Sequence, residues 1–217
     1  GLQFDISNVS QLGLLQSEKS ITINRQTKAA ALYATNGMNE ILPFSAHIGA
    51  SLSRYFESTE LISETRPLHE KVRLAASGFP VIYLGYQWRT DAAFPFHSSL
   101  YHPEDNSQTF CRDLLSIPWN TDLLALYATQ DKGLETKNFP IDLKLCLMNN
   151  GVKNVIARTW PGADEYASAV LLKRFFRNIA AGIPPAKALR LAKQLVHDEI
   201  DKHPSFWGGY QLDGAAF

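Results

Sequence analysis

The sequence predicts an α/β fold of three layers, in which helices cover both faces of a mainly parallel sheet of six strands. Short apolar runs alternate with segments of helical spacing along all 217 residues, and this alternation is typical of parallel strands joined by crossover helices. The apolar run over residues 123–127 is unbroken and leads into a polar turn. Such a run suits a strand that is buried on both faces.

Six apolar segments bounded by turn residues predict the strands of this sheet. In chain order they are residues 29–35, 60–62, 79–85, 122–129, 152–157 and 207–212. Segments with helical spacing or helix-end residues separate the strands and predict the helices. These are residues 45–56, 67–75, 107–116, 140–150, 164–182 and 184–196. Residues 1–28 are polar and mixed and are expected to be a lead-in segment to a single domain spanning residues 1–217.

Particular residues are expected to begin or end the helices. Ser45 is a candidate N-cap, and Pro67 can open the next helix at its first position. Asn149-Asn150-Gly151 is a C-cap signal. Asp164 stands where a long helix is predicted to begin, which leaves it either a capping role or a role in a site.

The composition argues against several classes of protein. The chain has 21 Lys or Arg and 21 Asp or Glu, whereas a nucleic-acid-binding protein would show a basic excess or stripe. No run reaches the roughly 18 apolar residues of a membrane span, and no segment reads as a signal peptide. Cys111 and Cys146 form neither a disulfide framework nor a metal-ligand spacing. We therefore expect a cytoplasmic domain that binds no cofactor, metal, nucleic acid or membrane.

A long aromatic and polar loop is predicted from Tyr86 to Pro103. Its ring-bearing residues include Tyr86, Trp88, Phe94, Phe96, His97 and His102. A loop of this length in a compact domain usually has a function. Two interpretations stay open: the aromatic side chains pack over the sheet edge and fill the space there, or they present an exposed surface to a peptide or partner.

Several motifs in the C-terminal half of the chain occur in a specific order. Residues 150–160, Asn-Gly-Val-Lys-Asn-Val-Ile-Ala-Arg-Thr-Trp, followed by Asp164, resemble a stretch of the CHAT domains, which are caspase-like peptidase-fold modules. Further motifs resemble the same family in the same order. They are Leu42-Pro43-Phe44-Ser45, Ser98-Ser99-Leu100, the helix with Gly182, Ala188, Leu189 and Ala192, and the closing residues 203–214. The resemblance implies the C-terminal portion of a longer protein, in which helical repeats often precede such a domain.

Members of that family use a Cys–His dyad, in which a thiolate attacks the scissile carbonyl and an imidazole transfers the proton. The resemblance places the histidine position, after the third strand, on Gln87, and the glycine that follows it on Trp88. It places the cysteine position, after the fourth strand, on Thr129. A glutamine amide does not take up a proton, and a threonine hydroxyl without a base is close to inert. Both dyad positions are therefore degenerate, and we expect a pseudopeptidase that acts as a protein-interaction or regulatory module.

Other candidate binding residues surround these two positions. They are Tyr86, Trp88, His97, Arg158, Trp160 and Asp164. Trp160 and Trp207 belong to the family's own pattern and are expected to be structural. The cations of the last two long helices are expected to form a solvated face rather than a nucleic-acid patch.

Two alternative functions stay open. An active peptidase could have rebuilt its dyad from Cys111 with His97 or His102, although both cysteines fall among apolar neighbours on predicted helices, where a thiol behaves as a small hydrophobe. A small-ligand-binding α/β domain is the other alternative. The sequence has no Gly-rich phosphate loop to support it.

Overall fold

A six-stranded sheet forms the centre of the computed structural model, which describes residues 22–33, 43–56, 58–61, 66–89, 91, 93–102, 106–127, 141–158 and 164–214. The strands lie in the order β2 (Ser58–Leu61), β1 (Lys28–Tyr33), β3 (Val81–Gly85), β7 (Leu123–Leu126), β8 (Asn154–Arg158) and β9 (Tyr210–Gly214). The first five run parallel to one another, and β9 pairs with β8 in the antiparallel direction. This confirms the predicted mainly parallel sheet.

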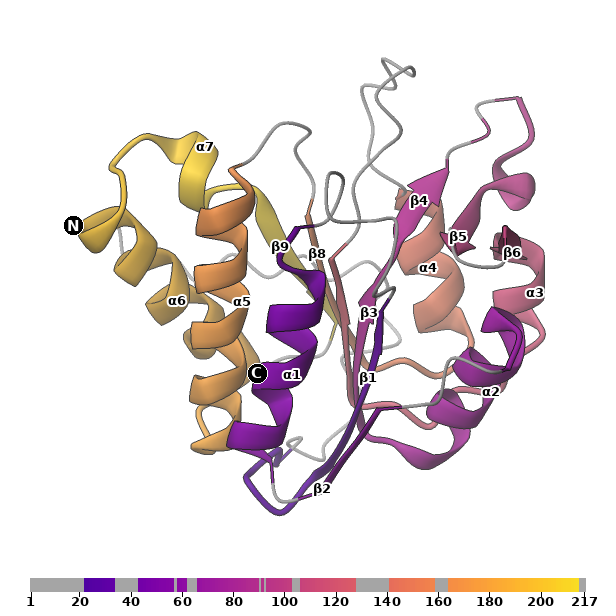
Figure 1. The fold of residues 1–217 in the computed structure, drawn as a ribbon, viewed down its shortest axis with the longest axis horizontal. Helices are drawn as coiled ribbons and strands as arrows, with labels where there is room; N and C mark the ends of the chain where they lie inside the picture. Colours follow the sequence, from indigo (N-terminus) through magenta and orange to yellow (C-terminus); the bar gives the residue numbers. More distant parts are fainter. Residues whose placement is uncertain are drawn as a thin grey trace.

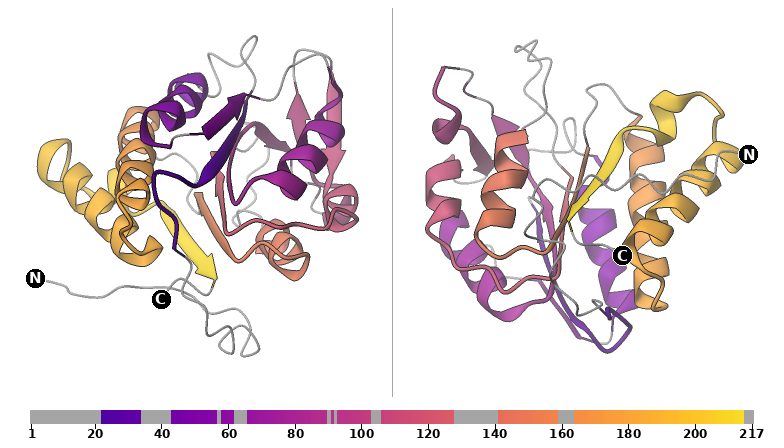
Figure 2. Two further views of the ribbon diagram at one scale, coloured as in Figure 1. Left: turned by 90° about the horizontal axis from the view of Figure 1, so that it is seen from below. Right: turned by 180° about the vertical axis from the view of Figure 1, so that it is seen from behind.

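Helices cover both faces of the sheet, as predicted (Figures 1 and 2). One layer consists of α1 (Ser45–Tyr55), α5 (Glu165–Ala180) and α6 (Pro185–Glu199). The other consists of α2 (Leu68–Gly78), α3 (Cys111–Leu115) and α4 (Ile141–Asn149). Every residue of β3, β7 and β8 is buried, which explains the unbroken apolar runs of β3 and β7 and the apolar centre of β8 between Asn154 and Arg158.

A second, antiparallel sheet corrects the prediction of a long loop between Tyr86 and Pro103. It consists of β4 (Gln87–Arg89), β5 (Ser99–His102) and β6 (Ser107–Phe110), with the one-turn helix η2 (Pro95–His97) between β4 and β5. Residues 107–110 were predicted to be helical, and the helix begins only at Cys111. These three strands are short and mix polar with apolar residues, so they lack the continuous apolar run that predicts a buried strand such as β7.

Two further local predictions are wrong. Ser45 is the first residue of α1 and not its N-cap: Phe44 holds the cap position, and the Ser45 hydroxyl donates to the carbonyl of Gly85 over 3.1 Å. The last strand was predicted to begin at Trp207, but Pro204–Trp207 form the short helix α7, which Pro204 opens at its first turn. Of the predicted lead-in segment, residues 1–21 lie outside the described part of the chain.

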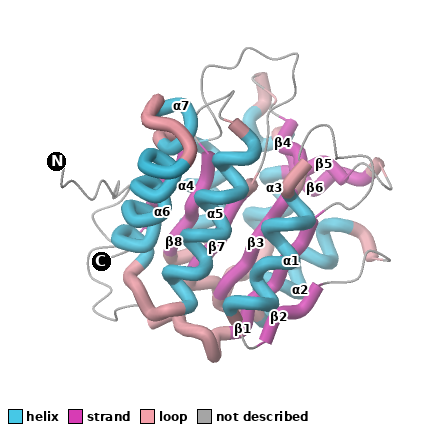
Figure 3. Tube along the Cα trace, turned by 60° about the vertical axis from the view of Figure 1, so that its left-hand side comes forward, coloured by secondary structure: helices cyan, strands magenta, loops and turns pink. Residues whose placement is uncertain are grey.

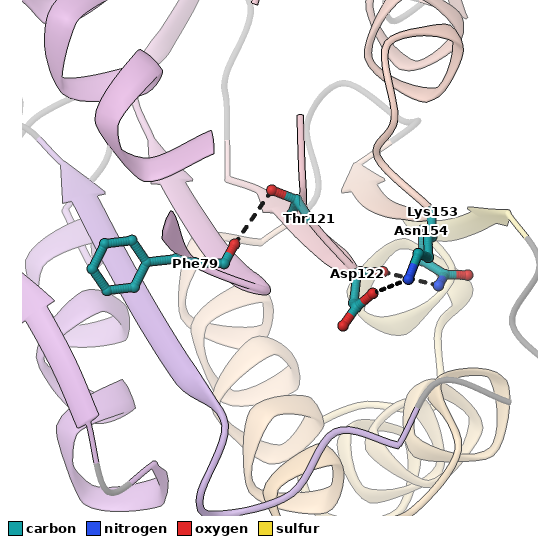
Figure 4. Close-up of polar contacts among 5 residues, drawn as sticks. All are labelled: Phe79, Thr121, Asp122, Lys153 and Asn154. Carbon is teal, nitrogen blue, oxygen red and sulfur yellow. Dashed lines mark hydrogen bonds and ion pairs between the residues drawn. The ribbon is translucent and has the colours of Figure 1, made fainter. Parts of the chain in front are cut away.

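The amino ends of the inner strands are joined by side-chain hydrogen bonds (Figure 4). The Thr121 hydroxyl donates to the carbonyl of Phe79 over 3.3 Å. Asp122 receives two contacts: its carboxylate lies 2.6 Å from the Lys153 ammonium, and its carbonyl accepts from the Asn154 amide over 3.0 Å. These contacts fix the register of β3, β7 and β8 at the edge of the sheet where the three strands begin.

Candidate functional site

The candidate site lies at the opposite edge, where the parallel strands end. Tyr33, Gly85, Leu126 and Arg158 are the last residues of β1, β3, β7 and β8. Because β9 runs antiparallel, it begins at this same edge, with Tyr210 paired to Arg158. Open α/β sheets bind their ligands at the carboxyl ends of the strands.

A polar network joins three elements at this edge. The Arg158 guanidinium donates from Nη1 to Oε1 of Glu165 over 2.7 Å, and the Tyr127 hydroxyl donates to Oε2 of the same carboxylate. Tyr127 follows β7, Arg158 ends β8 and Glu165 begins α5. The Arg158 side chain is only 5% exposed and that of Glu165 is 27% exposed. One carboxylate thus balances a buried cation and fixes the ends of two strands.

Burial and charge set the protonation states in this network. Burial raises the pKa of Tyr127 well above its usual value, with the tyrosine at position 210 and the Glu165 carboxylate adding to the shift. Burial also raises the pKa of Tyr210, although the nearby Arg158 opposes the shift. For Arg158, burial alone would lower the pKa, but Tyr210 and Glu165 offset it and the pKa is raised. The network therefore consists of neutral phenols around an ion pair at neutral pH.

A second contact holds the end of β3 against the start of α1. The Tyr83 hydroxyl donates to the backbone carbonyl of Ser45 and lies 3.1 Å from its hydroxyl. Burial raises the pKa of Tyr83 well above its usual value, so it stays a donor. A Cβ atom at Gly85 would lie 1.9 Å from the Ser45 hydroxyl oxygen. Only glycine permits this approach of helix to strand.

The residues around the expected histidine position are buried. Gln87 begins β4, pairs with Tyr101 of β5 and is 4% exposed. Tyr86 and Trp88 are each 1% exposed, and among the described residues the indole Nε1 of Trp88 has no hydrogen-bond partner. These two aromatic side chains pack inward, as the first of the two interpretations of this loop predicted.

Phe94 and Phe96 behave in the opposite way. They are 63% and 57% exposed, which agrees with the second interpretation. His97 is exposed as well, with its ring centroid 5.4 Å from that of Phe94. The structure therefore divides the aromatic residues of this segment between the core and the surface.

The residues of the alternative dyad differ in exposure. Cys111 is 1% exposed at the first position of α3, and its backbone N–H donates to the carbonyl of Ser98 over 2.7 Å. A reactive thiolate needs partial exposure and an electropositive surrounding. The burial of Cys111 therefore favours the packing role expected of it. The side chains of His102 and Cys146 lie outside the described part of the structure.

Of the other site residues predicted from the sequence, some lie outside the described residues and one has a capping role. Thr129 and Trp160 lie outside the described residues. Asp164 is the N-cap of α5, and its carboxylate accepts from the Ala167 N–H over 2.7 Å, which confirms the capping interpretation. Sequence reasoning missed Tyr127, Glu165 and Tyr210. They come from three separate elements, and no local pattern links them to Arg158.

The described residues offer no candidate for a metal site or for a membrane-crossing helix. Among them, no group of three or more His, Cys, Asp or Glu side chains could hold a metal ion. None of the described helices has the length and apolar character needed to cross a membrane.

Comparison with known proteins identifies a family. The family model of the CHAT domain matches residues 93–215, which is more than half of the chain. The match begins just before η2 and ends just after β9. A search of curated proteins returned no match.

Proposed function

The chain belongs to the CHAT-domain family of caspase-like peptidase-fold domains, and from that premise we propose that it is a non-catalytic member acting as a protein-interaction or regulatory module. The observation that carries the proposal is Gln87. The resemblance expects the catalytic histidine at this position, and an amide side chain stands there, 4% exposed and part of β4. Thr129 stands where the resemblance expects the nucleophilic thiol.

The chemical consequence of these two residues supports the proposal. General base catalysis typically contributes about 10²–10⁴-fold, and an amide cannot supply it. A hydroxyl nucleophile without a neighbouring base is not activated. Trp88, in place of a glycine, adds a large side chain next to the same position. The sparse cysteine content supports a reducing compartment such as the cytoplasm for this module.

The experiment is a search for turnover. The purified chain is incubated with a diverse peptide library and with a thiol-reactive substrate analogue, and products and adducts are read by mass spectrometry. We expect neither hydrolysis nor labelling in the wild type. The double variant Gln87→His/Thr129→Cys is expected to gain labelling at position 129, whereas Thr129→Cys alone gains much less because it lacks the base.

Cys111→Ala is the matched control for the alternative dyad. Hydrolysis by the wild type that disappears in Cys111→Ala would overturn the proposal and establish a rebuilt peptidase. Hydrolysis that survives this substitution would overturn it as well and point to a different nucleophile.

A further inference from the structure

The α5–α6 hairpin carries a concentration of positive charge. Residues 166–197 contain six Lys or Arg and no Asp or Glu. These cations are Lys173, Arg174, Arg177, Lys187, Arg190 and Lys193. The whole chain has 21 residues of each sign, so this excess on the hairpin is matched by an equal acidic excess on the rest of the molecule. A charge division of this kind within a neutral chain is a feature of interaction surfaces.

The cations lie on the outer side of a helical layer. Helices α5 and α6 lie side by side over the sheet (Figures 1 and 3). Their apolar side chains face inward: Phe175 and Phe176 of α5 and Ala188 and Ala192 of α6 are fully buried. Arg177 and Lys187 are exposed, and Lys173, Arg174 and Lys193 are half-buried. The outer face of the hairpin is therefore basic over much of its length.

These charges have little local compensation. Within the described part of the chain, Lys173, Arg174, Arg177, Lys187 and Lys193 form no ion pair. Of the carboxylates at the ends of the two helices, Glu165 is paired with Arg158, and Asp198 lies 2.7 Å from the Nδ1 of His197. Glu199, the exposed last residue of α6, forms no ion pair with these cations within the described part of the chain.

Two of the five cations lose hydration without gaining an anion. The Nε of Arg174 is buried with no hydrogen-bond partner among the described residues. Burial lowers the pKa of Lys193. A half-buried cation without a counter-charge is unfavourable, and an anion from outside would relieve this cost.

We propose that the outer face of α5 and α6 is a docking surface for an acidic polypeptide segment of a partner protein. This inference rests on the proposed function, because it names the class of partner for a protein-interaction module. Charge complementarity selects an anionic occupant.

The surrounding side chains favour a polypeptide over other anions. Single-stranded nucleic acids need exposed aromatic side chains for base stacking, and Phe175 and Phe176 are buried. Membrane-surface helices present large apolar side chains beside their cations. The exposed large hydrophobic side chains of the described residues are Leu74, Phe94, Phe96 and Tyr166. Of these four, Tyr166 alone belongs to the hairpin, at the first turn of α5, and its ring packs edge-on against Phe44, 6.0 Å away between centroids. One such ring provides neither a row of stacking platforms nor an apolar helix face.

The test compares two triple variants with the same change in net charge. The wild type is titrated into a fluorescein-labelled peptide of sixteen residues rich in Glu and Asp, and anisotropy gives the Kd. Lys173→Gln/Arg177→Gln/Lys187→Gln is expected to weaken binding about tenfold, since an exposed ion pair contributes roughly a 1.4- to fivefold factor in affinity. Arg25→Gln/Arg66→Gln/Arg73→Gln removes three exposed cations from other parts of the surface and is expected to leave the Kd unchanged. Circular dichroism verifies that both variants are folded.

Each outcome decides the question. Equal Kd values for the two triple variants, or equal binding of a matched Gln/Asn-rich peptide, would overturn the proposal. Tighter binding of a single-stranded RNA or of phosphatidylserine vesicles at the same nominal charge would assign the surface to another class of partner and also overturn it.

The mass of the peptide after incubation tests the proposed function separately. Cleavage of a bound peptide would contradict the non-catalytic function and leave the docking surface supported. A peptide that stays intact and does not bind would contradict the docking surface and leave the non-catalytic function supported.

Discussion

Glu165 accepts hydrogen bonds from Arg158, which ends β8, and from Tyr127, which directly follows β7. Its carboxylate is the counter-charge of Arg158, whose side chain is 5% exposed, and it also receives the Tyr127 hydroxyl. If this carboxylate is removed, the buried guanidinium keeps its charge but loses this counter-charge. Such a loss is far more costly than the loss of an exposed ion pair.

The substitution Glu165→Gln isolates this effect because it keeps the shape and removes the charge. We expect the free energy of unfolding to fall by about 2–4 kcal/mol, somewhat less than for a fully buried pair because Glu165 is 27% exposed. Urea unfolding measures the change. Glu199→Gln, at an exposed position near the end of α6, is the matched control and should change stability by less than about 0.5 kcal/mol. Equal effects of the two variants would contradict the assigned role of Glu165.

At the scale of single residues, the sequence predicts the roles that depend on neighbouring positions in the chain. The capping role of Asp164 could be predicted because an N-cap and the helix that it begins are neighbours in the chain. The significance of Gln87 and Thr129 came from the order of motifs and not from any local pattern. The network of Tyr127, Arg158 and Glu165 could not be predicted, because only the pairing of β7 with β8 and the start of α5 bring these side chains together.

At the scale of elements, the apolar pattern of a segment decides what could be predicted. The long helices α5 and α6 and the buried strands β3 and β7 have clear patterns, and the sequence predicts them within a few residues. The sheet of β4, β5 and β6 was missed because its stability depends on pairing between short segments. Trp88, Leu100 and Thr109 form one cross-strand row of this sheet, and all three are buried. This row attaches the small sheet to the body of the protein.

A buried ion pair attaches the last strand to a helix. The Lys144 ammonium of α4 lies 2.6 Å from Oδ2 of Asp213 in β9, and the two side chains are 8% and 9% exposed. Lys144→Met is expected to lower the free energy of unfolding by about 3–5 kcal/mol, because among the described residues the Asp213 carboxylate would keep only the Gln211 amide as a side-chain partner. Lys144→Met/Asp213→Leu should recover most of this loss, since an apolar pair can replace a buried ion pair. A double-mutant cycle by urea unfolding measures both effects.

The control pair for this cycle lies at the amino end of β7 (Figure 4). Lys153 and Asp122 are also 2.6 Å apart, but their side chains are 52% and 27% exposed. Lys153→Met should cost less than about 1 kcal/mol because water screens the pair. If the two lysine substitutions cost the same, burial is not what makes the Lys144 pair important.

At the scale of the whole molecule, three buried tyrosines govern stability in alkali. The pKa values of Tyr83, Tyr127 and Tyr210 are all raised, with burial as the largest cause. In the unfolded chain these phenols lose their protons near pH 10, whereas in the folded protein they keep them. The stabilisation is therefore fully present below about pH 10 and is lost as the pH rises above it. Each group contributes a slope of up to roughly 1.4 kcal/mol per pH unit.

Tyr210→Phe tests this account. The Tyr210 hydroxyl has no partner with hydrogen-bond geometry among the described residues, although the Ser168 hydroxyl is close enough to act on its pKa. Its removal should therefore change stability at pH 7 by less than about 1 kcal/mol. Above pH 10 the decline of the free energy of unfolding should become shallower by about a third, as measured by urea unfolding at several pH values. An unchanged alkaline slope would show that Tyr210 does not retain its proton.

The reversed direction of β9 places both of its ends against buried charges. Tyr210, its first residue, pairs with Arg158 at one edge of the sheet, and Asp213, three positions further, forms the ion pair with Lys144 of α4. If this strand peeled away from β8, two cations would be uncovered at once. Separation of β9 from β8 would therefore cost free energy near both ends of the strand. We expect β9 to detach only when the whole domain unfolds.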